Sequence, residues 1–256
     1  MSLIKPLFRI TKGNIEVLIF GDIDEISEYA AEECLHISEK SINRQGYFTA
    51  ALSGGTTPAG LYRRLAVSER DDLWYRTHIF LVDERLVSFE EKESNYRMIR
   101  QTLLSRVNIP DNNIHPIPAD TLSPESAAAK YEEDLISFFK TEKGLPPRFD
   151  LVILGIGDDG HTASLFPGTP AVSEAVRLSV AVTPPDISMK YRVSITLPVI
   201  NNADHIIFLA SGDEKAGVLR DVLERPDSFL PASQVKPLKG TVKFLIDEPA
   251  SSLLSR

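Results

Sequence analysis

The stretch that decides the fold is residues 149–168, which read FDLVILGIGDDGHTASLFPG. An apolar run of strand type leads into a glycine-rich turn, and small residues that favour the start of a helix follow. The turn carries two carboxylates, Asp158 and Asp159, and one imidazole, His161. Ligands of α/β proteins bind where a strand ends and leads to a helix. We therefore expect this turn to lie in the functional site and His161 to be its reactive group.

Strand-like and helix-like segments alternate on both sides of this stretch. We expect strands at 15–20, 47–52, 78–82, 114–117, 150–154, 178–182, 192–196, 205–209 and 241–246. We expect helices at 22–43, 59–66, 94–107, 123–143, 198–203 and 213–223. Several strands are almost entirely apolar, which is typical of a parallel sheet covered on both faces. The sequence therefore predicts an α/β fold with three α/β/α layers around a mostly parallel, Rossmann-like sheet, formed by a single domain over residues 1–256.

The composition argues against several classes of protein. The 256 residues carry a net charge of −8, which is unfavourable for nucleic acid as the main partner. No apolar run is long enough to span a membrane, and residues 1–5 lack the apolar core of a signal peptide. The one cysteine, Cys34, permits no internal disulfide, and its expected role is buried packing. We expect a cytoplasmic protein whose partner is a small molecule.

A candidate anion site follows the strand expected at 47–52. The turn there reads Ser53-Gly54-Gly55-Thr56-Thr57-Pro58. Thr57 is suited to cap the next helix and Pro58 to occupy its first position. The glycines permit close approach to the backbone, and the N–H groups at a helix start attract an anion such as phosphate. The turn lacks the lysine of a nucleotide-binding P-loop, and an ordinary strand–helix turn is the alternative.

The turn around His161 also matches the dinucleotide-binding pattern G-x-G-x-x-G, at residues 155–160. Its two carboxylates would repel a pyrophosphate, and no ribose-binding acid follows about 20 residues later, so we do not expect NAD. His161 can instead take a proton from water, with Asp159 as the carboxylate that fixes its tautomer. A capping or buried structural histidine is the alternative. The remaining histidines show no metal-ligand spacing and are expected to be structural: His36, His78, His115 and His205.

Charged residues at other element ends complete the set of candidates. Asp83, Glu84 and Arg85 end an apolar strand, so at least one of them should line a cleft, where Arg85 could bind a carboxylate, a phosphate or an oxyanion. A structural ion pair is the alternative for Arg85. Arg192 opens a strand, and Lys215 lies near a helix start, where a cation opposes the helix dipole and is more plausible as a ligand group than as a stabiliser. A surface lysine is the alternative for Lys215.

Together these segments resemble the 6-phosphogluconolactonase family, which shares its fold with glucosamine-6-phosphate isomerase/deaminase. The resemblance extends over most of the chain and rests on six blocks in family order. They are ALSGGTTP at 51–58, VDER at 82–85 with ESNY at 93–96, GIGDDGHTASLFP at 155–167, RVSIT at 192–196, GDEKA at 212–216 and PASQV at 231–235.

The resemblance implies hydrolysis of 6-phospho-D-glucono-1,5-lactone to 6-phosphogluconate, the second step of the oxidative pentose phosphate pathway, without a metal or an organic cofactor. It implies that the turn at 53–57, Arg192 and Lys215 bind the phosphate. It also implies that His161 is the general base, supported by Asp159. Arg85 would stabilise the oxyanion or position the substrate, and Asp83 is expected to contact the substrate.

Alternatives remain on the same fold. The blocks around Arg85 and His161 favour the lactonase over the deaminase. Two departures from the lactonase pattern, Leu86 in place of tryptophan and Asp204 in place of a basic residue, remove no proposed catalytic group. A non-catalytic sugar-phosphate sensor is a further alternative, although such regulators usually carry a DNA-binding domain and this chain begins directly with an α/β pattern.

Overall fold

A main sheet and a smaller second sheet organise the computed structural model, which describes residues 4–68, 70–120, 123–142, 145–186, 188–225 and 227–255. In this part of the chain the main sheet has eight strands in the order β1-β2-β11-β10-β7-β3-β4-β6. Its strands are β1 (Phe8–Lys12), β2 (Ile15–Phe20), β3 (Phe48–Leu52), β4 (Thr77–Leu81), β6 (Ile114–His115), β7 (Leu151–Leu154), β10 (His205–Ala210) and β11 (Thr241–Asp247). The second sheet consists of β5 (Asp83–Arg85), β9 (Arg192–Ile195) and β8 (Ser179–Val182).

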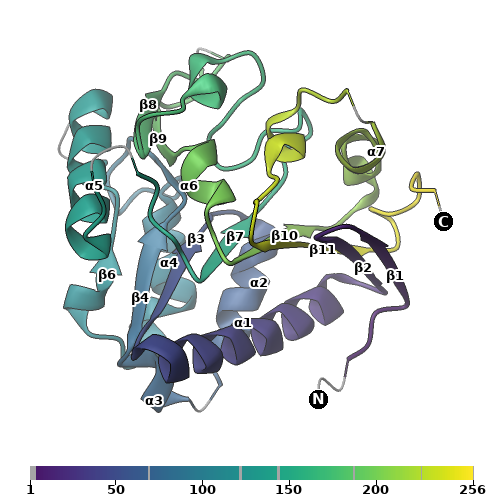
Figure 1. Ribbon diagram of the computed structural model, residues 1–256, viewed down its shortest axis with the longest axis horizontal. Coiled ribbons are helices and arrows are strands. Elements are labelled where there is room, and N and C mark those ends of the chain that lie inside the picture. The colour runs from purple at the N-terminus through teal and green to yellow at the C-terminus, as the bar shows by residue number, and fades with distance from the viewer. Residues whose placement is uncertain are drawn as a thin grey trace.

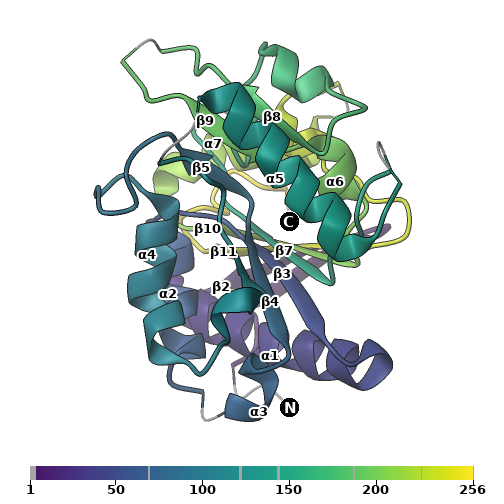
Figure 2. The same ribbon diagram turned by 90° about the vertical axis from the view of Figure 1, so that its left-hand side faces the viewer.

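Helices cover both faces of the main sheet (Figures 1 and 2). The α-helices are α1 (Ile23–Gln45), α2 (Thr56–Leu65), α3 (Asp71–Trp74), α4 (Asn95–Thr102), α5 (Pro124–Phe139), α6 (Leu197–Asn201) and α7 (Ala216–Glu224). Short 3₁₀ helices are η1 (Leu104–Arg106), η2 (Asp111–Asn113), η3 (Pro170–Ser173), η4 (Asp213–Lys215) and η5 (Pro231–Gln234). Helices α1, α2 and α4 lie on one side of the strands, and α5, α6 and α7 lie on the other with the second sheet. This is the three-layer α/β fold that the sequence predicts.

The four central strands of the main sheet bring distant parts of the chain to one edge. β10 pairs with β7, β7 with β3, and β3 with β4, all in parallel. Parallel neighbours end at the same edge, so the residues that follow Leu52, Leu81, Leu154 and Ala210 meet there. This carboxyl edge is where α/β proteins bind ligands.

Local sequence signals fix the ends of the long helices. The side chain of Asp22 accepts hydrogen bonds from the N–H groups of Asp24 and Glu25, so it caps α1, and Gly46 ends the helix at φ 91°. The apolar face of α1 packs on the sheet, with Cys34 buried in it as expected. Ser123 caps α5 as the sequence predicts.

The second sheet differs from the expected arrangement. The segments at 178–182 and 192–196 are strands, but they pair antiparallel with each other instead of extending the parallel sheet. Asp83, Glu84 and Arg85 do not simply end β4, because they form β5, which pairs antiparallel with β9. The pairing of β5 with β9 joins segments far apart in the chain, so local periodicity could not reveal it.

Several element boundaries also differ. β1 was not expected and pairs antiparallel with β2 at one sheet edge. α2 begins at Thr56 with Gly55 as its N-cap, so the prediction that Thr57 caps this helix is wrong. α4 ends at Thr102 and continues only as 3₁₀ structure. α5 ends at Phe139 because Lys140 adopts a left-handed conformation at φ 52°, and the predicted end at Lys143 lies outside the described residues.

Candidate active site

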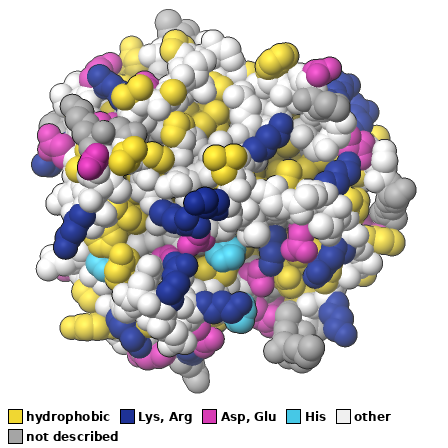
Figure 3. Space-filling model, viewed as in Figure 1, with side chains coloured by type: hydrophobic (Ala, Val, Ile, Leu, Met, Phe, Trp, Pro, Cys, Tyr) yellow, Lys and Arg dark blue, Asp and Glu magenta, His cyan; other side chains and the backbone are white. Residues whose placement is uncertain are grey.

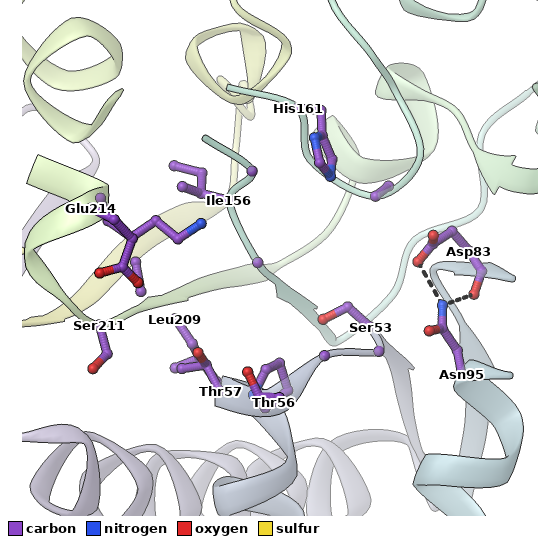
Figure 4. Close-up of a pocket in the computed structure, with 18 of the residues that line it drawn as sticks. Ser53, Thr56, Thr57, Asp83, Asn95, Ile156, His161, Leu209, Ser211 and Glu214 are labelled. Carbon is purple, nitrogen blue, oxygen red and sulfur yellow. Dashed lines mark hydrogen bonds between the residues drawn. The ribbon is translucent and has the colours of Figure 1, made fainter. Parts of the chain in front are cut away.

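A cleft with a volume of about 430 Å³ opens at the carboxyl edge of β10, β7, β3 and β4 (Figure 4). Figure 4 shows His161 across the cleft from Thr56 and Thr57. Ser211 and Glu214 lie at one end, and Asp83 and Asn95 lie at the other. The cleft brings together all but one of the predicted site residues: Ser53, Gly54, Gly55, Thr56, Thr57, Asp83, Arg85, His161, Arg192 and Lys215. The exception is Asp159, which contacts His161 without lining the cleft.

The N-terminus of α2 forms one wall of the cleft. Gly55 precedes the helix at φ 111°, a conformation that L-residues rarely adopt, and no side-chain cap bonds the first N–H groups. The helix start therefore keeps its positive partial charge and its donors for a ligand. The hydroxyl of Ser53, just before this helix, is buried and has no hydrogen-bond partner among the described residues.

Lys215 approaches the cleft from the segment after β10. Its ammonium lies 2.5 Å from a carboxylate oxygen of Asp158, which belongs to the turn around His161. Asp158 is largely exposed, with 76% of its side-chain surface accessible, so this ion pair contributes little stability. An anionic ligand can therefore replace Asp158 as the partner of Lys215.

The turn from Gly157 to His161 is held by its own backbone. The N–H of Gly157 donates to the carbonyl of His161, and the N–H of Gly160 donates to the carbonyl of Gly157. Gly160 has φ 79°, which suits glycine. A Cβ at Gly157 would lie 2.1 Å from Nδ1 of His161, so only glycine leaves room for this ring. Of the three glycines in the G-x-G-x-x-G pattern, Gly157 thus provides the space for the imidazole.

One carboxylate orients His161. Oδ1 of Asp159 lies 2.6 Å from Nδ1 of His161 and also accepts from the N–H of His161 at 3.0 Å. A carboxylate only accepts, so the neutral ring carries its proton on Nδ1 and presents a lone pair on Nε2. No described residue is hydrogen-bonded to that Nε2. The predicted contact between Asp159 and His161 is present, and the arrangement suits proton transfer.

Asp83 and Arg192 form a buried pair in the lining of the cleft. Arg192 lies 3.8 Å from Asp83, and Ser164 donates to the same carboxylate at 2.5 Å. Burial lowers the pKa of Arg192, whereas the negative charge of Asp83 raises it. The guanidinium also lies over the ring of Phe166, and its Nε has no partner in the described structure. The contacts of Arg192 are thus with Asp83 and Phe166, and no described contact joins it to the turn at 53–57.

Arg85 lines the cleft without an acidic partner among the described residues, so the alternative of a structural ion pair is wrong for this side chain. It donates to Oδ1 of Asn95 at 2.5 Å and to the carbonyl of Glu93 at 2.9 Å. Glu84 points away from the cleft into the start of α4, where it accepts from Asn95 and Tyr96. Burial raises the pKa of Glu84, and these hydrogen bonds lower it.

The sequence alone assigned no role to several cleft residues. Asn95 was noticed only as part of the ESNY block. Ser211 donates to Asp247 at 2.5 Å, and Ser164, which is buried behind the cleft lining, donates to Asp83. Small polar residues beside a motif are the only signal that pointed to them. Among the described residues, no group of three or more histidine, cysteine, aspartate or glutamate side chains could hold a metal ion.

Known proteins share this arrangement of elements. The family model described as glucosamine-6-phosphate isomerases/6-phosphogluconolactonase matches residues 21–244. The chain belongs to this family. A relative named 6-phosphogluconolactonase from Synechocystis sp. is 42% identical to it over 218 residues, which cover 84% of this chain and 88% of the relative.

Solved structures of the glucosamine-6-phosphate isomerase/6-phosphogluconolactonase family agree with the fold. A 6-phosphogluconolactonase from Trypanosoma cruzi is 32% identical with a TM-score of 0.84, and the match covers 94% of this chain and 97% of that one. A monomeric glucosamine-6-phosphate deaminase is 24% identical with a TM-score of 0.77, over 93% of this chain and 99% of that one. At that identity the deaminase supports the fold alone.

Proposed function

We propose that this protein hydrolyses 6-phospho-D-glucono-1,5-lactone to 6-phosphogluconate in the oxidative pentose phosphate pathway. The observation that carries the proposal is the His161–Asp159 pair beside a cleft with an uncapped helix start and Lys215 in its lining. The relative from Synechocystis sp. and the structure from Trypanosoma cruzi both bear the lactonase name and favour this reaction over deamination.

The phosphate of the substrate would bind at the start of α2. Free N–H groups at a helix N-terminus and a lysine ammonium together suit a phosphate dianion. Thr56, Thr57 and Lys215 line the cleft there, and Gly55 lets the backbone turn toward the ligand. Ser53 belongs to the same turn and would also contact the phosphate. The resemblance assigns Arg192 to the phosphate as well, but its side chain contacts Asp83 and not the turn at 53–57, so we propose that Arg192 and Asp83 contact the rest of the substrate. This binding would set the lactone carbonyl beside His161.

In the chemical step, Nε2 of His161 takes a proton from a water molecule as its oxygen attacks the lactone carbonyl carbon. Negative charge moves to the carbonyl oxygen, where the Arg85 guanidinium can stabilise it. When the intermediate collapses, the bond to the ring oxygen breaks and the imidazolium gives that oxygen the proton. Asp159 stabilises the imidazolium between the two transfers. The lactone also hydrolyses unaided, so general-base catalysis of about 10²–10⁴-fold, with positioning, is a sufficient acceleration.

A coupled assay with freshly generated lactone, corrected for spontaneous hydrolysis, tests the proposal. We expect enzyme-dependent formation of 6-phosphogluconate that persists after treatment with a chelator, because the proposed mechanism uses no metal. Release of ammonia from glucosamine 6-phosphate without lactone hydrolysis would instead identify a deaminase. Binding of 6-phosphogluconate without turnover would identify a sensor.

The proposal extends to how the chain is organised and where it acts. We propose that the chain acts as one domain in the cytoplasm. The net charge of −8 is unfavourable for nucleic acid as a partner. On the face drawn in Figure 3, acidic and basic side chains are intermixed. No helix of the described chain has the length and apolarity needed to cross a membrane.

A further inference from the structure

Asn95 connects the two charged groups at one end of the cleft. Its Nδ2 donates to the carbonyl of Asp83 at 2.9 Å and to the carboxylate of Asp83 at 3.2 Å. Its Oδ1 accepts from Arg85 at 2.5 Å. We propose that Asn95 is a positioning residue that keeps Arg85 directed at the reacting carbonyl and apart from Asp83. This inference rests on the lactonase function proposed above.

The chemistry of the contacts permits only one orientation of the Asn95 amide. The two groups of Asp83 can only accept, and the guanidinium of Arg85 can only donate. Flipping the amide would therefore place acceptor against acceptor and donor against donor. The side chain is 2% exposed, so water could not compensate for those mismatches. The amide is thus a fixed, uncharged spacer between a carboxylate and a guanidinium.

The backbone of Asn95 is fixed by Glu84. The Glu84 carboxylate accepts from the N–H of Asn95 at 2.7 Å, from the N–H of Tyr96 at 2.8 Å and from the hydroxyl of Ser94 at 3.0 Å. Ser94 in turn caps α4 by accepting from Arg97. Glu84, which points away from the cleft, therefore fixes the start of α4, the helix that carries Asn95.

Gly54 provides the space for the amide. A Cβ at Gly54 would lie 1.8 Å from Oδ1 of Asn95, a distance that atoms cannot adopt. The turn at 53–57 thus uses Gly55 for its conformation and Gly54 for contact with Asn95. Two blocks of the sequence, SGGTTP and ESNY, interlock through this contact.

The separation of Arg85 from Asp83 by the Asn95 amide matters because Asp83 already contacts Arg192. The carboxylate of Asp83 faces Arg192 at 3.8 Å and accepts from Ser164. Without the amide, Arg85 could swing toward Asp83 and form a strong bidentate pair, since guanidinium and carboxylate match in geometry. That pair would withdraw positive charge from the site where the oxyanion forms. Asn95 therefore maintains two separate cationic groups in the cleft.

The decisive experiment compares Asn95→Asp with the wild type across pH. A protonated aspartic acid at this position can donate to Asp83 and accept from Arg85, as the amide does, whereas the ionised form cannot donate. Burial and the negative charges of Asp83 and Glu84 favour the protonated form, and the positive charges of Arg85 and Arg192 oppose it. We expect kcat about 10-fold below wild type at about pH 8, with KM changed less than about threefold, because a lost charge-assisted hydrogen bond is worth about this factor.

A positioning role for Asn95 should appear in how the ratio of variant to wild-type kcat changes with pH. It should rise at least about threefold between about pH 8 and about pH 6 as the new side chain gains its proton. Asn95→Ala should lower kcat by a factor that does not change with pH. Asn202→Asp is the matched control, since this amide donates to the carbonyls of Pro146 and Pro147 outside the cleft, and its kcat ratio should stay near one.

A flat ratio for Asn95→Asp, or wild-type kcat in Asn95→Ala, would overturn the inference. If Asn95→Asp does not fold by circular dichroism, Asn95→Ala carries the test alone, because it removes the amide without adding charge. It should lower kcat more than KM, and unchanged kcat would overturn the inference. A wild-type enzyme that does not hydrolyse the lactone would refute the proposed function itself, which separates the two failures.

Discussion

Two histidine–carboxylate pairs lie at different places in this molecule. In the cleft, Nδ1 of His161 lies 2.6 Å from Asp159. In β6, at the edge of the main sheet, Nδ1 of His115 lies 3.0 Å from Asp134. Judged only by the distance from Nδ1 to the carboxylate oxygen, the two pairs are nearly equivalent.

The second ring nitrogen distinguishes them. Nε2 of His115 lies 3.4 Å from Nδ1 of His78, and its ring stacks on Phe80 at 4.0 Å between centroids. Both nitrogens of His115 are therefore occupied within an aromatic cluster. Nε2 of His161 has no described partner, and the ring lines the cleft. A histidine–carboxylate pair is thus a candidate base only where its other nitrogen can reach a substrate.

The largest effect should come from His161→Ala. We expect kcat to fall by about 10²–10⁴-fold, because the general base is lost. Binding of 6-phosphogluconate, measured by calorimetry, should remain, because the residues proposed to bind phosphate are unchanged. His115→Ala is the matched control and should lower the free energy of unfolding by about 1–3 kcal/mol while leaving kcat per folded molecule unchanged. Equal losses of kcat in the two variants would break the comparison.

A smaller effect is expected at the phosphate end of the cleft. Lys215→Ala should raise KM by about 10-fold with little change in kcat, since a charge-assisted hydrogen bond to the phosphate is lost. Asp158→Asn removes the competing partner of Lys215, so its KM should be equal to or below that of the wild type. Steady-state kinetics measure both values. An unchanged KM in Lys215→Ala would remove this lysine from the phosphate site.

The smallest effect concerns His78, the partly buried histidine beside His115 at the sheet edge. Burial, and secondarily the neighbouring His115, lower the pKa of His78 to about 4 from an ordinary value of 6.5. Between these values the unfolded chain binds more protons than the folded one, so stability is lost as pH falls from about 6.5 to about 4. Solvent screening at this partly exposed side chain limits the loss to about 1 kcal/mol.

Urea unfolding at about pH 7.5 and about pH 4.5 measures this loss. We expect His78→Phe to reduce the difference in unfolding free energy between the two pH values, because the titrating group is gone. A pH dependence equal to that of the wild type would show that His78 does not titrate as its surroundings indicate.

Much of the fold and of the site could be predicted from local sequence. Apolar strands of parallel type indicated the sheet, and the turns after Leu52 and Leu154 indicated the cleft, because carboxyl ends of parallel strands share an edge. The contact between Asp159 and His161 was expected because both lie in one short turn. Each of these inferences rests on a pattern formed by neighbouring residues in the sequence.

The remainder depends on contacts between distant segments. The pairing of β5 with β9 joins Asp83 to Ser194 in register, which no periodicity encodes. The role proposed for Asn95 depends on Glu84, which fixes the start of α4, and on Gly54, which lies against the amide. Neither contact follows from the local sequence around Asn95. Thr57 does not cap α2 because Gly55, at a positive φ that favours glycine, precedes the helix and lets it begin at Thr56.

The contact between Gly54 and Asn95 also limits how this sequence can evolve. Any side chain at Gly54 collides with the amide, so this glycine can change only after Asn95 has become smaller. Loss of the amide alone leaves an empty space beside two charged groups. The two positions therefore form an epistatic pair with a preferred order of substitution. In descendants of this chain, we expect a larger residue at position 54 only where position 95 is no longer asparagine.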